Sequence, residues 1–82
     1  MITPSRPLTN AEADVAKLLG QGMSYQDIGR TLHISPRTVE AYVHRIADLI
    51  PNPDDLKPAT HVMLWSAHQL WLERHEDKAK AS

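Results

Sequence analysis

Apolar residues recur along the chain at intervals of three and four positions, and this helical period continues through four separate segments. Glycines, prolines and small polar residues separate the segments, and the sequence has no stretch with the alternating pattern of a β-strand. The pattern therefore predicts an all-α protein with four helices. We expect these helices at about residues 10–19, 24–32, 36–50 and 58–76.

The polar residues that open three of these segments are typical helix caps. Thr9 and Glu12 have the spacing of a capping box, in which the hydroxyl accepts from the Glu12 amide and the carboxylate reaches back to the Thr9 amide. Ser24 and Ser35 are placed to cap the second and third helices. Pro36 stands at the first helical position, where a missing N–H costs nothing. These caps predict where the helices begin.

The boundaries of the helices suggest how the chain is organised. Residues 1–7 contain two prolines and few apolar side chains, so we expect a flexible arm. A three-helix core should span 8–50 and end at the loop 51–57, because the two prolines of that loop cannot continue a helix. We expect a C-terminal helix over 58–76 and a frayed polar tail over 77–82.

The last predicted helix has two apolar faces. One face is expected to pack on the first three helices, and it comprises Ala59, Val62, Met63, Ala67 and Leu70. The second face is larger than a lone small domain should expose, which favours a homodimer. The residues that we assign to the dimer interface are His61, Leu64, Trp65, His68, Trp71 and Leu72. The alternative is that Trp65 or Trp71 folds onto the core of its own chain.

Three histidines on this helix raise the question of a metal site. His61, His68 and His75 are spaced by seven residues, which puts about 10 Å of helix rise between neighbours. One chain cannot bring residues so far apart onto one ion, so we expect no metal and assign the rings to a dimer seam or to solvent. If the rings meet across a dimer, their protonation at low pH should weaken it.

Composition restricts the classes of function. The 82 residues suffice for one small domain, and the lack of cysteine excludes disulfides and thiolate zinc sites. Nine Lys and Arg residues against ten Asp and Glu residues leave a net charge of −1, so no overall basic field attracts nucleic acid. The sequence contains no membrane-spanning run and no signal peptide, so we expect a cytoplasmic protein that does not contact a membrane.

The sequence offers no arrangement that is typical of catalysis. It contains no glycine-rich phosphate loop, no cysteine nucleophile and no recognisable pair of acid and base. We therefore expect neither an enzyme nor a cofactor, and no small-molecule substrate.

The second and third predicted helices form a helix-turn-helix pattern. Two short helices joined by a tight turn, the second with a polar outer face, are typical of proteins that read the DNA major groove. Between positions 24 and 47, three arginines against Asp27 and Glu40 leave a net charge of only +1. Few phosphate contacts give modest affinity, so two copies on one site would strengthen binding.

Three stretches of the sequence carry a family resemblance. LTNAE at 8–12, LLGQGMS at 18–24 and IGRTLHISPRTVE at 28–40 resemble the LuxR/GerE-type helix-turn-helix domain, and the resemblance covers about half of the chain. It implies a four-helix domain whose third helix enters the major groove of double-stranded DNA and whose long fourth helix supports dimerisation. The implied function is transcriptional regulation. Many members carry histidine at the position of Tyr42 and alanine at that of Gly29.

The resemblance also implies roles for individual residues. Base contacts fall to Glu40, Ala41 and His44, and contacts to the DNA backbone fall to Tyr25, Gln26, Ser35, Arg37, Thr38 and Arg45. Glu40 can accept from a cytosine amino group, and Ala41 can touch a thymine methyl. The alternative for Glu40 is an ion pair within its own helix, with Arg37 or His44.

Two rival functions remain open from the sequence. A promoter-recognition module similar to the last domain of a sigma factor would use a comparable helix-turn-helix with RNA polymerase as its partner. A protein-interaction module would instead use the exposed face of the last helix, and the near-neutral charge favours this alternative.

Overall fold

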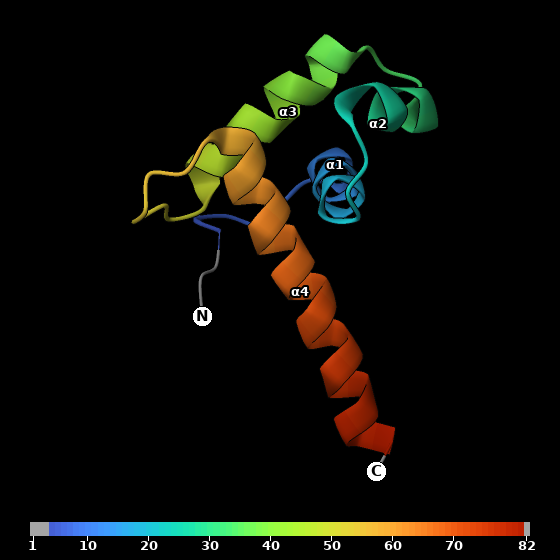
Figure 1. The fold of residues 1–82 in the computed structure, drawn as a ribbon, viewed down its shortest axis with the longest axis vertical. Helices are drawn as coiled ribbons and strands as arrows, with labels where there is room; N and C mark the ends of the chain where they lie inside the picture. Colours follow the sequence, from blue (N-terminus) through green and yellow to red (C-terminus); the bar gives the residue numbers. More distant parts are fainter. Residues whose placement is uncertain (1–3, 82) are drawn as a thin grey trace.

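The computed structural model describes the backbone of residues 4–81 and the side chains of residues 4–74. This part of the chain forms four helices and no strand: α1 (Asn10–Gly20), α2 (Tyr25–Leu32), α3 (Pro36–Leu49) and α4 (Pro58–Ala81). The prediction of an all-α fold is confirmed. Figure 1 shows α4 running past the other three helices, so that its C-terminal half extends away from them.

Side-chain caps form the predicted helix starts. The Glu12 N–H donates to Oγ1 of Thr9 at 3.2 Å, and the Thr9 N–H donates to Oε1 of Glu12 at 2.9 Å, which completes the capping box. At α2 and α3, the hydroxyls of Ser24 and Ser35 accept from the amides three residues later. Each cap satisfies an amide that the helix leaves without a backbone partner, so these helix starts are encoded locally.

A tight turn holds α2 against α3. His33 ends α2 in the left-handed conformation with a φ of 60°, a position that favours glycine in most helices. A Cβ on Gly29 would lie 2.6 Å from the carbonyl oxygen of Ile34, so the missing side chain gives the backbone room to pass closely. The two short helices are thereby fixed relative to each other.

One apolar core joins the four helices. Its buried side chains are Val15, Ala16, Leu19, Ile28, Val39, Val43, Ile46, Ile50 and Val62. Helix α4 packs against both α1 and α3. Because Val39, Val43 and Ile46 follow the helical period, one face of α3 lies in the core and the opposite face remains in solvent. Burial of these side chains supplies the main stabilisation of the fold.

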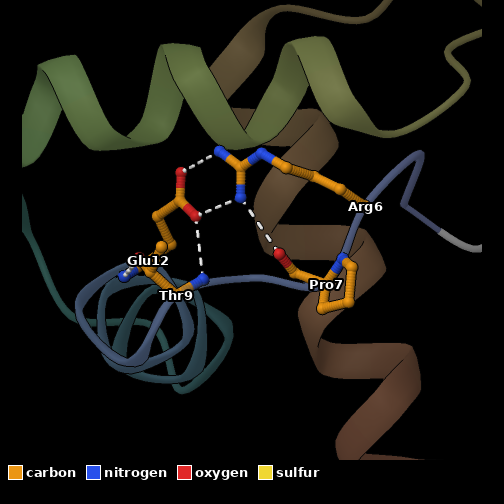
Figure 2. A network of polar contacts seen from close by, with 4 residues as sticks. All are labelled: Arg6, Pro7, Thr9 and Glu12. Atoms are coloured by element: carbon orange, nitrogen blue, oxygen red, sulfur yellow. Dashed lines mark hydrogen bonds and ion pairs between the residues drawn. The ribbon is translucent and has the colours of Figure 1, made fainter.

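The segment before α1 is bound to the rest of the fold. Both terminal nitrogens of Arg6 donate to the carboxylate of Glu12, each at 2.9 Å (Figure 2). The Ser5 N–H donates to the carbonyl oxygen of Leu49 at the end of α3, at 2.8 Å. Ser5 and Arg6, which the sequence placed in a flexible arm, are thus hydrogen-bonded to α3 and α1. The physical reason is that the buried carboxylate requires a cation, which Arg6 supplies.

The C-terminal helix is longer than the sequence suggested. It continues through Ala81, whereas the predicted end was at 76 and the tail was expected to fray. The residues after 76 include two alanines and two lysines, which favour helix, and no glycine or proline interrupts them. The outermost parts of the predicted arm and tail, residues 1–3 and 82, lie outside the described residues.

The carboxylate of Glu12 stays charged although its side chain has no exposed surface. Hydrogen bonds from Arg6, and then those from Thr9, lower the pKa of Glu12 from 4.5 to about 2, against the opposing effect of burial. Because the pKa is lower in the folded state, the ion pair stabilises the fold fully above about pH 4.5. This stabilisation is lost as the pH falls toward 2.

Replacing Arg6 with alanine leaves the buried carboxylate without its cation. We expect the free energy of unfolding at neutral pH to fall, because a buried charge without its partner is costly. The difference from the native chain should narrow in acid, because protonation of Glu12 removes the charge in both proteins. Urea unfolding followed by circular dichroism over a series of pH values measures both effects.

Arg30→Ala is the matched control for this prediction. It removes an arginine whose side chain is 78% exposed and lies 3.9 Å from Asp27. The change in stability should stay below about 0.5 kcal/mol. An equal loss in the two variants would contradict the special role of Arg6.

Candidate nucleic-acid interface

The outer face of α3 carries the three residues predicted to contact DNA bases. Since the valines of this helix are buried, Glu40, Ala41 and His44 lie on its exposed side. Together with Arg37 they line a shallow hollow of about 220 Å³. The structure therefore brings the three residues together and adds Arg37, for which the sequence implied a contact to the DNA backbone.

Glu40 has a neighbour of opposite character on its own helix. Its Oε1 lies 3.7 Å from Nε2 of His44, and both side chains are more than half exposed. Of the two partners that the sequence left open, His44 and not Arg37 is within ion-pair distance, and the pair is charged only when the imidazole is protonated. An exposed pair of this kind contributes about 0.3–0.5 kcal/mol. Glu40 can therefore exchange this contact for a hydrogen-bond donor on a ligand.

The first turn of α3 gathers three of the residues predicted to contact the DNA backbone. Ser35, Arg37 and Thr38 are all exposed at this position. The Ser35 hydroxyl accepts from the Thr38 N–H at 3.1 Å and lies 2.9 Å from the Thr38 hydroxyl, so the turn is already ordered. Backbone amides and the positive end of the helix dipole make such a turn favourable for a phosphate group.

The start of α2 provides two more of the predicted residues. Gln26 is exposed, whereas Tyr25 is half-buried and packs against the core. Burial, and then the negative charge of Glu40, raise the pKa of Tyr25 above its usual value of 10. The hydroxyl is therefore protonated at neutral pH and can donate a hydrogen bond.

Two arginines on α3 form no ion pair with a carboxylate among the described side chains. Among the described side chains, neither Arg37 nor Arg45 has a carboxylate within ion-pair distance, whereas Arg30 lies near Asp27. The guanidinium carbon of Arg45 lies 5.5 Å from the centre of the Tyr42 ring. Sequence reasoning missed this contact, although the spacing of three residues on one helix was a signal for it.

A comparison with known protein families identifies the family of this chain. Residues 6–49, more than half of the chain, match the family model described as "Bacterial regulatory proteins, luxR family". The chain belongs to the luxR family. Members of this family are DNA-binding transcription regulators and are generally not enzymes. No curated protein and no solved structure matches the chain.

Helix α4 of this luxR-family protein lies beyond the matched residues, and the surface predicted on it is narrower than expected. His61 is only 6% exposed, and its Nε2 lies 3.2 Å from the carbonyl oxygen of Ile50. Trp65 is half-buried and packs against the core. His61 is therefore not part of an exposed seam, because the end of α3 and the loop after it cover this side of α4.

The exposed apolar surface of α4 centres on two large side chains. Leu64 and Trp71 are each 52% exposed. His68 is exposed as well, and its ring stacks on Trp71 with 6.2 Å between the ring centres. Leu72 is half-buried. These residues remain available for a contact with a second molecule.

A groove of about 350 Å³ lies beside this surface, between α4 and the preceding loop. It is lined by Pro51, Asn52, Pro53, Asp54, Leu56, His61, Leu64, Trp65, His68 and Gln69. The Asn52 side chain holds the loop, since it donates to the carbonyl of Leu56 at 2.8 Å and accepts from the Leu56 N–H at 3.0 Å. One wall of the groove is therefore ordered by its own hydrogen bonds.

The histidines of α4 have different environments in the structure. His61 is buried and His68 is exposed, while the side chain of His75 lies outside the described residues. Within the described part of the chain, no three His, Cys, Asp or Glu side chains are grouped to hold a metal. In the same part, no helix combines the length and the apolar character needed to cross a bilayer.

The different positions of His61 and His68 lead to a prediction about stability. His61→Ala removes the partner of the Ile50 carbonyl and leaves a buried void, so the free energy of unfolding should fall by about 2 kcal/mol. His68→Ala, on the exposed side of the same helix, should change it by less than about 0.5 kcal/mol. Urea unfolding at low protein concentration, where association is minimal, compares the two. Equal effects would contradict the assignment of His61 to the core.

Proposed function

We propose that this luxR-family protein is a sequence-specific transcriptional regulator that inserts α3 into the major groove of duplex DNA and binds as a homodimer through α4. The observation that carries the proposal is the outer face of α3, whose polar side chains are exposed while the opposite face is held in the core. The major groove is about 12 Å wide and admits one helix. A DNA-binding role in a bacterial family also supports a cytoplasmic location.

The base contacts follow from the chemistry of three exposed side chains. The Glu40 carboxylate accepts from the amino group of cytosine, and the Ala41 methyl contacts the methyl group of thymine. His44 reaches a base edge one turn further along the helix. In this arrangement the weak contact between His44 and Glu40 is exchanged for contacts with DNA.

The proposed phosphate contacts lie on both sides of the base-contacting residues of α3. Ser35, Arg37 and Thr38 at the start of α3 bind one phosphate region, and the position of Arg37 in the hollow also lets it reach a guanine. Arg45 binds the backbone near the middle of α3. Tyr25 and Gln26 at the start of α2 bind the backbone on the other side of the groove.

The small charge of the motif supports a dimer. A net charge of +1 between positions 24 and 47 allows few phosphate contacts per copy, and two linked copies multiply their affinities. One side of α4 has the spacing of a helix pair, with intervals of four and three between Thr60, Leu64, Ala67, Trp71 and Arg74. Four of these residues are exposed, whereas Ala67, which the helical period assigns to the core-facing side, is half-buried.

We propose an antiparallel pairing of two α4 helices that cross near Ala67, the smallest residue of this series. In this arrangement Trp71 of one copy packs on Leu64 of the other and enters the adjacent groove. Arg74 of the first copy then approaches Asp54 of the second, which is a favourable pairing of charges. Two-fold symmetry makes the same contact twice. Of the other members of the predicted interface, His68 and Leu72 lie beside this seam, whereas His61 and Trp65 line the groove.

Selection of binding sites from a random pool of duplexes, at low and at moderate salt, tests the proposed function. We expect enrichment of an inverted repeat whose half-sites lie about one helical turn apart. A single asymmetric site would contradict the homodimer and favour a monomer or a module that binds with RNA polymerase. No enrichment at either salt concentration would contradict DNA reading and favour a protein-interaction module on the exposed face of α4.

Trp71→Glu tests the α4 pairing separately. A carboxylate cannot enter an apolar groove without a partner, so this variant should sediment as a monomer and keep its helical circular dichroism. In the selection it should enrich single half-sites with lower affinity. Glu73→Gln is the matched control and should remain dimeric, because Glu73 lies on the side of α4 toward α1. A Trp71→Glu dimer with native sedimentation would contradict this interface.

A further inference from the structure

Tyr42 is a residue on α3 for which the proposed function has no role. Its side chain is half-buried and packs against the core. Arg45, three residues later and therefore on a neighbouring position of the helix surface, is exposed and has its guanidinium carbon 5.5 Å from the centre of the ring. A core residue thus touches a residue of the DNA-facing surface.

The contact has the geometry of a cation–π interaction. A guanidinium group within about 6 Å of a ring centre is attracted by the negative charge of the ring face. Arginine is suited to this role because its planar group can stack through its face while its N–H bonds point outward from its edge. The nitrogens that would bind a phosphate therefore stay available while the group is stacked.

The surroundings of Arg45 contain no competing partner. Among the described side chains, no carboxylate lies within ion-pair distance of it, in contrast to Arg6 and Arg30. An exposed arginine loses considerable rotamer freedom when it binds a ligand. A ring that is itself held by the core reduces that loss, because it restricts the arginine before binding.

We propose that Tyr42 is a positioning residue that holds Arg45 ready to bind a phosphate of duplex DNA. This inference rests on the proposed function. Arg37 provides the internal contrast, since no stacking ring accompanies it among the described residues. Tyr42 therefore acts on one of the two unpaired arginines of α3 and leaves the other unaffected.

The test compares the affinity of Tyr42→Leu, Tyr42→Phe and Arg45→Ala for one duplex over a series of salt concentrations. The probe is the duplex enriched by the native chain, or a random-sequence duplex of equal length if none is enriched. Leucine keeps an apolar side chain for the core but removes the ring, whereas phenylalanine keeps the ring. Circular dichroism and thermal unfolding establish that each variant is folded.

We expect Tyr42→Leu to bind about three-fold more weakly. The slope of log affinity against log salt should become shallower, by up to about 0.9 for each phosphate contact that is lost. Tyr42→Phe should bind like the native chain. Lys17→Ala is the matched control for removal of a positive charge, because Lys17 lies on α1 beside α4 and away from the outer face of α3, and it should leave the slope unchanged.

The double variant separates positioning from a general structural role. In the Arg45→Ala background, Tyr42→Leu should cause no further loss, because the arginine that it positions is gone. An equal loss in both backgrounds, or a native slope in Tyr42→Leu, would overturn the role of Tyr42 and leave the proposed function standing. If the native chain binds neither duplex, both the proposed function and this inference are overturned.

Discussion

The buried carboxylate of Glu12 is the constraint to which the rest of the fold is tied. A charge with no exposed surface must be met by donors, and the Thr9 amide and the Arg6 guanidinium supply them. The same pairing fixes the segment before α1, and Ser5 in that segment binds the carbonyl at the end of α3. One buried charge therefore links the start of α1 to the end of α3, through residues outside the helix-turn-helix itself.

The features that the sequence predicted are those that depend on neighbours within one helical turn. The caps at Thr9, Ser24 and Ser35 each involve an amide three residues away, so their geometry is independent of the remaining chain. The ion pair of Arg6 with Glu12 joins residues six positions apart, one before α1 and one within it, and no capping or periodicity rule predicts it. Because this ion pair was not predicted, the segment before α1 was expected to be flexible.

In the candidate site too, the sequence predicted the features that depend on local pattern and missed those that depend on tertiary packing. Helical periodicity sufficed to place Glu40, Ala41 and His44 on one exposed face, because the opposite face of α3 is apolar. The rotation of α4 was not predictable in this way, since it depends on the path of the loop after α3. That path buries His61 and leaves Leu64 and Trp71 outside, and a helical wheel alone assigns all three to one surface. The contact between Arg45 and the Tyr42 ring likewise depends on side-chain positions that helical periodicity does not specify.

The carbonyl groups of Leu49, the last residue of α3, and of Ile50, its C-cap, have partners that precede and follow α3 in the sequence. Leu49 accepts from Ser5, which precedes α1, and Ile50 accepts from His61 in α4. The C-terminal end of α3 is therefore hydrogen-bonded both to the segment before α1 and to α4. In the proposed dimer joined along α4, these hydrogen bonds would keep the distance between the two α3 helices nearly constant. Under the proposed function, such a dimer would favour DNA in which the two half-sites lie at one fixed separation.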